Sequence, residues 1–171
     1  MKSNIVLTGF MATGKTTVGQ KLSLLLNKDF IDADVEIERA TKLPIPQIFS
    51  LYGEACFRAE EALILKKLAQ LRDVVIATGG GAVLHVGEME ELGRHGYIIC
   101  LTAAPETILA RIAAKSHRPL LPKNSSIEKV SALMQQRDAY YRRADLIIDT
   151  TDLNIEEISQ KILWFIEEKV R

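Results

Sequence analysis

A glycine-rich segment near the start of the chain has the composition of a phosphate-binding loop. Residues 9–16 match the pattern GxxxxGK[ST], follow a predicted strand at 5–8 and open a predicted helix at 15–26. The backbone N–H groups of such a loop and the positive end of the helix dipole converge on phosphate oxygens. We therefore predict a nucleotide-phosphate site, formed by Gly9, Met11, Ala12, Thr13, Gly14, Lys15, Thr16 and Thr17.

Two side chains of this loop suit a triphosphate and its metal ion. Lys15 is expected to reach the β- and γ-phosphates and to act in catalysis, and the Thr16 hydroxyl is expected to ligate Mg²⁺. Guanine-nucleotide switches also need DxxG and NKxD patterns, and the sequence contains neither. The loop therefore favours a kinase or an ATPase over a GTPase.

Two carboxylates follow the second predicted strand, at residues 30–32. Asp32 and Asp34 alternate in the sequence, and alternating side chains of a strand point to the same side, so we expect both to face one crevice. Phosphoryl transfer needs one carboxylate near Mg²⁺ and another near the acceptor hydroxyl. A second interpretation stays open, in which Asp34 only caps the next helix.

Short β-branched runs alternate with longer amphipathic ones along the chain. Further strands are predicted at 74–77, 97–101 and 146–148, and further helices at 33–40, 45–51, 54–71, from 105, at 127–142 and from 155. Residues 114–126 contain two prolines and little apolar periodicity, which predicts a mobile loop. This alternation predicts an α/β domain whose parallel sheet is covered on both faces and binds ligands at the carboxyl ends of its strands.

The overall composition excludes several functional classes. Lys plus Arg and Asp plus Glu number 22 each, so the chain lacks the cationic surface of a non-specific nucleic-acid binder. Cys56 and Cys100 lie far apart in the sequence, without a metal-binding spacing, and are expected to be reduced thiols. No apolar run reaches membrane-spanning length, and we expect a cytoplasmic monomer without a signal peptide that binds no membrane.

Six segments together resemble the shikimate kinase family: GFMATGKTT, FIDADVEIE, GEACFRAEE, VIATGGG, RPLL and the segment around Arg137. They occur in the family's order and approximate spacing over nearly the whole chain. The resemblance implies a P-loop kinase fold over residues 1–171, with a five-stranded parallel sheet in the order 2-3-1-4-5 and helices on both faces. It also implies an acceptor-binding segment at about 33–62 and a lid at about 112–125.

The same resemblance implies an activity. ATP and Mg²⁺ would serve a phosphotransferase that acts on the 3-hydroxyl of shikimate, in chorismate and aromatic amino acid biosynthesis. Asp34 would hydrogen-bond the acceptor hydroxyl and act as, or close to, the general base, and Asp32 would hold Mg²⁺ through water. Arg58 and Arg137 would bind the acceptor carboxylate, since forked guanidinium groups fit a planar carboxylate better than lysine does.

Further roles follow from the family's motifs. Glu61 lies one helical turn after Arg58 and is expected to hold its guanidinium. Three consecutive glycines exceed what one turn requires, and the resemblance implies that the backbone of Gly79, Gly80 and Gly81 approaches the substrate and the γ-phosphate.

The nucleotide would contact a third group of residues. Arg118, in the RPLL segment, is the candidate to close onto the phosphates. Arg111 matches a residue that stacks on adenine, with Asn154 on the opposite face of the base. His85 and His95 are expected to be loop residues without partners.

The sequence leaves alternatives open. Many family members have RxPLY where this chain has Arg137-Asp138-Ala139-Tyr140-Tyr141, so Arg142 or Arg143 is an alternative carboxylate ligand. Another P-loop metabolite kinase, such as a gluconate kinase, is the alternative enzyme. A non-catalytic nucleotide-binding homologue is the alternative outside enzymes, although Lys15 and Asp34 are both present.

Overall fold

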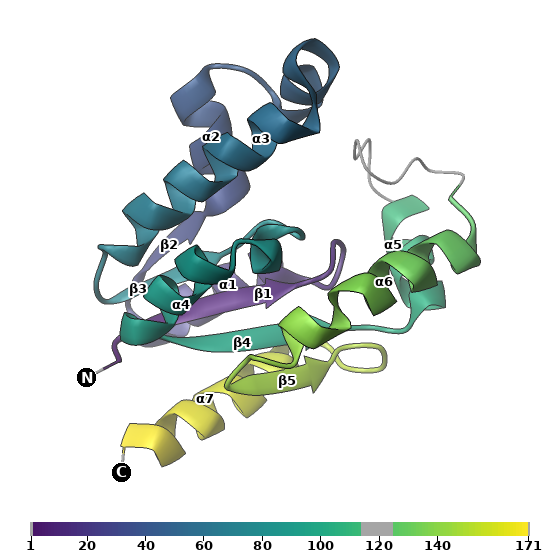
Figure 1. Cartoon of the computed structure of the whole chain (residues 1–171). Coiled ribbons are helices and arrows are strands. Elements are labelled where there is room, and N and C mark those ends of the chain that lie inside the picture. The colour runs from purple at the N-terminus through teal and green to yellow at the C-terminus, as the bar shows by residue number, and fades with distance from the viewer. Residues whose placement is uncertain (1, 114–124, 171) are drawn as a thin grey trace.

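Five parallel strands form one sheet in the order β2-β3-β1-β4-β5 (Figure 1). They are β1 (Asn4–Gly9), β2 (Asp29–Asp32), β3 (Val74–Ala77), β4 (Gly96–Thr102) and β5 (Leu146–Asp149). The computed structural model describes residues 2–113 and 125–170. The predicted fold class and strand order are confirmed.

Helices lie on both faces of the sheet (Figure 1). They are α1 (Lys15–Leu26), α2 (Ala33–Thr41), α3 (Ile45–Ala69), α4 (Val86–His95), α5 (Pro105–Ala113), α6 (Ile127–Tyr141) and α7 (Ile155–Val170), and a 3₁₀ turn, η1, covers Ala82–Leu84. The two helices expected at 45–51 and 54–71 are present as the two parts of α3, which are joined through the non-helical backbone of Gly53 (φ 80°). Within the described ranges, no helix combines the length and apolarity needed to cross a bilayer.

Helix α4 was not predicted from the sequence. It contains Gly87 and Gly93, and glycine in a helix costs about 1 kcal/mol relative to alanine. Leu92 is its one buried residue, so the segment lacks a long apolar stripe. Packing against α3 and β4 stabilises α4 where its local sequence does not.

The alternation of β1 explains how the two helix layers attach. Ile5 and Leu7 point to the face covered by α1 and α7, where Leu22 is fully buried beside them. Val6 points to the other face and packs with Leu65 of α3. Burying a side chain of this size contributes about 1.5–3 kcal/mol, so both layers are fixed to the central strand.

The register of the sheet brings three chain segments to one edge. Leu7 of β1 pairs with Ala77 of β3, and Ala77 pairs with Asp32 of β2. The residues that follow these three positions are the phosphate loop, the glycine loop (Gly79, Gly80 and Gly81) and the start of α2. The candidate site therefore forms at the carboxyl ends of β1, β2 and β3, as expected for a parallel sheet.

Candidate active site

The phosphate loop joins β1 to α1, and Lys15 is bound to its backbone. The Nζ of Lys15 donates to the carbonyl oxygens of Gly9 at 2.9 Å and of Phe10 at 2.8 Å. The Thr13 hydroxyl donates to the same Phe10 oxygen at 2.8 Å. Lys15 is buried, so these carbonyls help to satisfy an ammonium group that is largely removed from water. A phosphate at the loop has to compete with them for the ammonium.

Asp32 links the loop to the start of α2. Its Oδ2 accepts a 2.7 Å hydrogen bond from the Thr16 hydroxyl, and its Oδ1 accepts a 3.0 Å bond from the backbone N–H of Asp34. Asp32 is thus the N-cap of α2, and the expectation that Asp34 caps this helix is wrong.

The route by which Asp34 reaches the site also differs from the prediction. Strand β2 ends at Asp32, so the two aspartates do not alternate along one strand, and Asp34 lies in the first turn of α2. Both carboxylates nevertheless line one pocket together with Lys15, Thr16 and Gly80. The first turn of α2, and not alternation along a strand, brings the Asp34 side chain to the same pocket as Asp32.

The Thr16 hydroxyl and the Asp32 carboxylate fit a magnesium ion. Both are hard oxygen donors, and their 2.7 Å contact shows that one small cation can meet them together. The described part of the chain has no cluster of three or more His, Cys, Asp or Glu side chains that would form an all-protein metal cage. Mg²⁺ in phosphoryl-transfer sites usually takes one or two protein ligands and completes its shell with water and phosphate oxygens.

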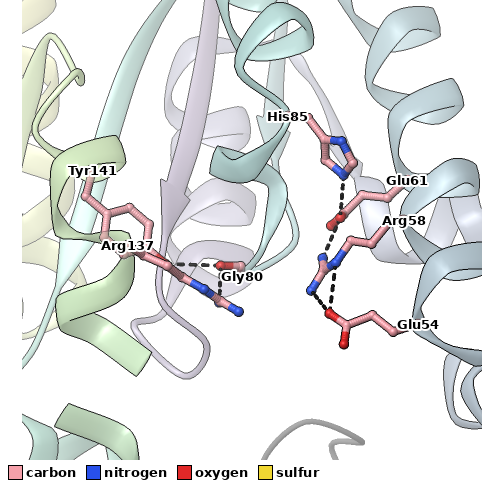
Figure 2. A network of polar contacts seen from close by, with 7 residues as sticks. All are labelled: Glu54, Arg58, Glu61, Gly80, His85, Arg137 and Tyr141. Atoms are coloured by element: carbon pink, nitrogen blue, oxygen red, sulfur yellow. Dashed lines mark hydrogen bonds and ion pairs between the residues drawn. The ribbon is translucent and has the colours of Figure 1, made fainter. Parts of the chain in front are cut away.

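On the other side of the crevice, Arg58 of α3 lies between two carboxylates (Figure 2). Its Nη1 donates to Glu61 Oε2 at 2.6 Å and its Nη2 donates to Glu54 Oε1 at 3.1 Å. Burial lowers the pKa of Arg58, but the charges and hydrogen bonds of Glu61 and Glu54 outweigh it and raise the pKa above its usual range. The expected contact between Arg58 and Glu61 is therefore present.

Glu61 has a second partner that the sequence did not indicate. Its carboxylate is 1% exposed, and the Nε2 of His85 lies 3.0 Å from the same Oε2 that contacts Arg58. The expectation that His85 lacks a partner is wrong, because η1 and the unpredicted helix α4 hold it against α3. His95, at the far end of α4, has no such contact with a carboxylate among residues 2–113 and 125–170.

Arg137 of α6 approaches the crevice from the opposite side (Figure 2). Its Nη1 donates to the carbonyl oxygen of Gly80 at 2.9 Å, and its guanidinium lies 5.6 Å from the centre of the Phe10 ring. The side chain is buried, yet no carboxylate of the described residues lies within ion-pair distance. A buried cation without a carboxylate partner is suited to an anionic ligand.

Tyr141 supports the same contact and was missed from the sequence. Its hydroxyl donates to Gly80 O at 3.1 Å, beside the Arg137 bond. Burial raises the pKa of Tyr141 to about 12, although the nearby Arg137 opposes this, so the hydroxyl keeps its proton at neutral pH. Its spacing of four residues from Arg137, on one helical face, was the available signal.

The two alternative arginines lie elsewhere. The Nε of Arg142 donates to Asp138 Oδ2 at 2.6 Å on an exposed surface, and Arg143 packs over the ring of Tyr140. Arg137 is therefore the arginine of this segment that faces the glycine loop.

The glycine loop lies between the two sides of the crevice and leaves no room for side chains. A Cβ on Gly79 would lie 2.7 Å from Glu61 Oε1 and 2.8 Å from Asp34 Oδ1. A Cβ on Gly81 would overlap the guanidinium of Arg58. These close approaches explain why glycines occur together here, and they show that Glu61 and Asp34 meet at one point of the backbone.

The predicted nucleotide contacts have structural partners of their own. Arg111 donates to Ala12 O at 3.3 Å and to Thr150 O at 2.9 Å, so it lies against the phosphate loop. Asn154 and Glu157 exchange backbone-to-side-chain hydrogen bonds of 2.8 and 3.0 Å at the start of α7, which is a capping box. Arg118 and most of the predicted lid at 112–125 lie outside the described residues.

A parallel sheet in this order, a phosphate loop beside two hard oxygen donors, and two arginines facing across a glycine loop define a P-loop kinase for a small anionic acceptor. Comparison with known proteins narrows this class. Residues 11–167 match the family model described as shikimate kinase. The chain is 44% identical to a shikimate kinase of Thermoanaerobacter pseudethanolicus over 94% of each chain. This chain belongs to the shikimate kinase family.

Solved structures agree with this assignment. A shikimate kinase from Acinetobacter baumannii, in complex with shikimate, superposes with a TM-score of 0.92 at 38% identity, over 99% of this chain and 95% of that one. A gluconokinase from Sinorhizobium meliloti superposes with a TM-score of 0.61 at 16% identity, over 98% and 94% of the two chains. The second likeness extends to the fold alone.

Proposed function

We propose that this chain transfers the γ-phosphoryl group of ATP to the 3-hydroxyl of shikimate, giving shikimate 3-phosphate and ADP for chorismate and aromatic amino acid biosynthesis. One observation supports the acceptor chemistry most directly. The buried guanidinium of Arg137, which pairs with no carboxylate among the described residues, points across Gly80 toward Arg58 (Figure 2). A planar carboxylate between two forked cations fits this arrangement.

In the proposed mechanism the acceptor is fixed before its hydroxyl reacts. Arg58 and Arg137 bind the carboxylate, and the Gly79–Gly81 backbone lies along the ring. Asp34 then accepts the proton of the attacking hydroxyl as the oxygen bonds to the γ-phosphorus and the bond to the β-phosphate oxygen breaks. A positioned base of this kind contributes roughly 10²–10⁴-fold in rate.

The nucleotide is bound at the phosphate loop in this proposal. Lys15 leaves the carbonyl oxygens of Gly9 and Phe10 for the β- and γ-phosphates, where its charge offsets the charge on the transferred group. Thr16 and Asp32 would hold Mg²⁺, Asp32 through a water molecule. Bound Mg²⁺ neutralises charge on the β- and γ-phosphate oxygens.

Three further side chains complete the proposed nucleotide site. Arg111 lies beside Ala12 of the loop, which is consistent with a place next to the base, and Asn154 would reach the base from the start of α7. Arg118 would close over the phosphates from a lid at 112–125. Exclusion of water by such a segment favours transfer to the acceptor over hydrolysis.

We also propose a single-domain, monomeric enzyme of the cytoplasm, with its acceptor-binding segment at 33–62. All proposed contacts to substrate come from one chain, so the site needs no second copy. Both cysteines are free, and burial raises the pKa of the Cys100 thiol to about 12, which makes it unreactive. Free thiols are typical of a reducing compartment.

The direct test is ADP release from Mg-ATP with shikimate, with gluconate and without an acceptor. Turnover that requires shikimate supports the proposal. Turnover with gluconate alone would reassign the acceptor while leaving the phosphate site intact. ATP binding without turnover in any reaction would indicate a non-catalytic homologue.

A further inference from the structure

His85 contacts the acceptor side of the site from a different element than any residue assigned above. It follows η1 and precedes α4, and its half-buried ring reaches Glu61 of α3 at 3.0 Å. Because a carboxylate only accepts hydrogen bonds, the ring proton of His85 must be on Nε2, and this N–H donates a hydrogen bond to Glu61 Oε2. The bond therefore joins the segment after the glycine loop to the helix that contains Arg58 (Figure 2).

The carboxylate of Glu61 has few other hydrogen-bond partners among the described residues. It is 1% exposed, and its Oε1 has no hydrogen-bond partner in the described structure. Its Oε2 is shared between Arg58 at 2.6 Å and His85 at 3.0 Å. Loss of His85 leaves Arg58 as the one partner of this buried carboxylate among the described residues, and leaving a buried acceptor under-satisfied is costly, which favours movement of the Glu61 side chain toward new partners.

Both acceptor-side arginines are therefore held in place through contacts to one short segment, residues 79–85. Arg137 is bonded directly to Gly80 O at 2.9 Å. Arg58 is connected to His85 through Glu61. The spacing between the two guanidinium groups therefore depends on this segment at both ends, although α3 and α6 are far apart in the sequence.

We propose that His85 is a positioning residue for the acceptor carboxylate, acting through Glu61 on the guanidinium of Arg58. This inference rests on the proposed function, because it assumes that Arg58 binds the carboxylate. His85 is not among the residues that line the pocket of Lys15, Thr16 and Asp34. Its loss acts on acceptor binding and leaves nucleotide binding as it was.

The test compares steady-state kinetics of the wild type, His85→Ala and His85→Gln. His85→Ala is expected to raise the KM for shikimate roughly three- to tenfold, the effect of one lost hydrogen bond, with little change in kcat or in the KM for ATP. His85→Gln returns an N–H donor and is expected to restore most of the affinity. His95→Ala is the matched control, because it removes a histidine from the other end of the same helix.

A double-mutant cycle tests the route through Arg58. If His85 acts by fixing that guanidinium, His85→Ala has little further effect on the KM for shikimate in an Arg58→Lys background. Additive effects of the two changes would overturn this route.

Other results distinguish a failure of this inference from a failure of the proposed function. An unchanged KM for shikimate in His85→Ala would overturn the inference alone, and so would an equal rise in the KM for ATP. Absence of shikimate turnover by the wild type would overturn the proposed function, and this inference with it.

Discussion

The two sides of the crevice satisfy their charged groups in different ways. On the nucleotide side, Lys15 bonds carbonyls five and six residues away, and Asp32 caps the helix that it precedes. On the acceptor side, Arg137 bonds a carbonyl 57 residues away, and Glu61 meets His85 across 24 residues. The phosphate loop is organised by contacts between residues close in the sequence, whereas the acceptor side combines such contacts with tertiary ones to Gly80 and His85.

This difference has a functional meaning. The loop bonds of Lys15 are replaceable, because a phosphate offers the ammonium stronger, charged acceptors than a carbonyl does. The acceptor side instead holds Arg58 between the half-exposed Glu54 and the buried Glu61, which His85 also contacts, and so fixes the guanidinium without a ligand. We expect changes on the acceptor side to act on shikimate alone, and changes where the two sides meet to act on the chemical step.

The largest expected effect is at Asp34, where the sides meet. Asp34→Asn keeps the shape of the side chain and removes its ability to accept a proton. The kcat should fall about 10²–10⁴-fold, with a smaller change in the KM for shikimate. Single-turnover kinetics measure this, and isothermal titration with ATP checks that the nucleotide side is intact. A mild loss of kcat would make Asp34 a positioning group.

Arg58→Lys should weaken shikimate binding while leaving ATP binding unchanged. Lysine keeps the charge and loses the forked geometry, so the KM for shikimate should rise about ten- to a hundredfold while the dissociation constant for ATP stays constant. Arg142→Lys makes the same exchange at an exposed arginine paired with Asp138 and should have no effect. Equal losses of affinity for both substrates in Arg58→Lys would contradict the assignment.

Gly81→Ala tests the close packing of the glycine loop against Arg58. The added methyl group overlaps the guanidinium, which must move, so kcat/KM for shikimate should fall by about one order of magnitude, as for other overpacked sites. Gly87→Ala on α4 is the matched control, since a Cβ there meets no atom within 4 Å. This control should retain activity and raise the melting temperature, because alanine favours a helix. Comparable losses in both variants would argue against the packing explanation.

The smallest expected effect is on stability at high pH. Burial raises the pKa of Tyr141 from 10.0 to about 12, so the neutral phenol is favoured by folding. This contribution is fully present below pH 10 and is lost as the pH rises from 10 to 12. Tyr141→Phe should be less stable than the wild type by about 0.5–1.5 kcal/mol at pH 8, through its lost bond to Gly80. Urea unfolding should show this difference shrinking above pH 10, and a constant difference would contradict the sign.

The same contrast explains what the sequence could predict. The strand order, the phosphate loop and the contact between Arg58 and Glu61 follow from motifs or from spacing within one element. Helix α4 was missed because two glycines and a single buried leucine obscure its period. His85 was missed because its partner, Glu61, belongs to another element and no local pattern indicates the contact. Tyr141 was missed although it lies one helical turn after Arg137 and bonds the same Gly80 oxygen.

Asp32 and Asp34 show a subtler failure. The alternation argument correctly predicted that both face one pocket, but it placed them on one strand, and the alternative in which Asp34 caps the next helix was wrong. Asp32 reaches the pocket from the end of β2 and Asp34 reaches it from the first turn of α2. The helical backbone that begins at Ala33 and the bond from Asp34 N to Asp32 Oδ1 separate this arrangement from a continued strand.

The convergence of both acceptor-side arginines on residues 79–85 also limits how this enzyme can be redesigned. Replacing only Arg58 or only Arg137 would change the position of one cationic group, while the other would stay fixed by its contacts to residues 79–85. A new acceptor of different length would require a graft of the 79–85 segment together with the Glu54–Glu61 turn of α3 and the Arg137–Tyr141 turn of α6. Directed evolution of acceptor range should accordingly select compensating changes in these three segments as a set.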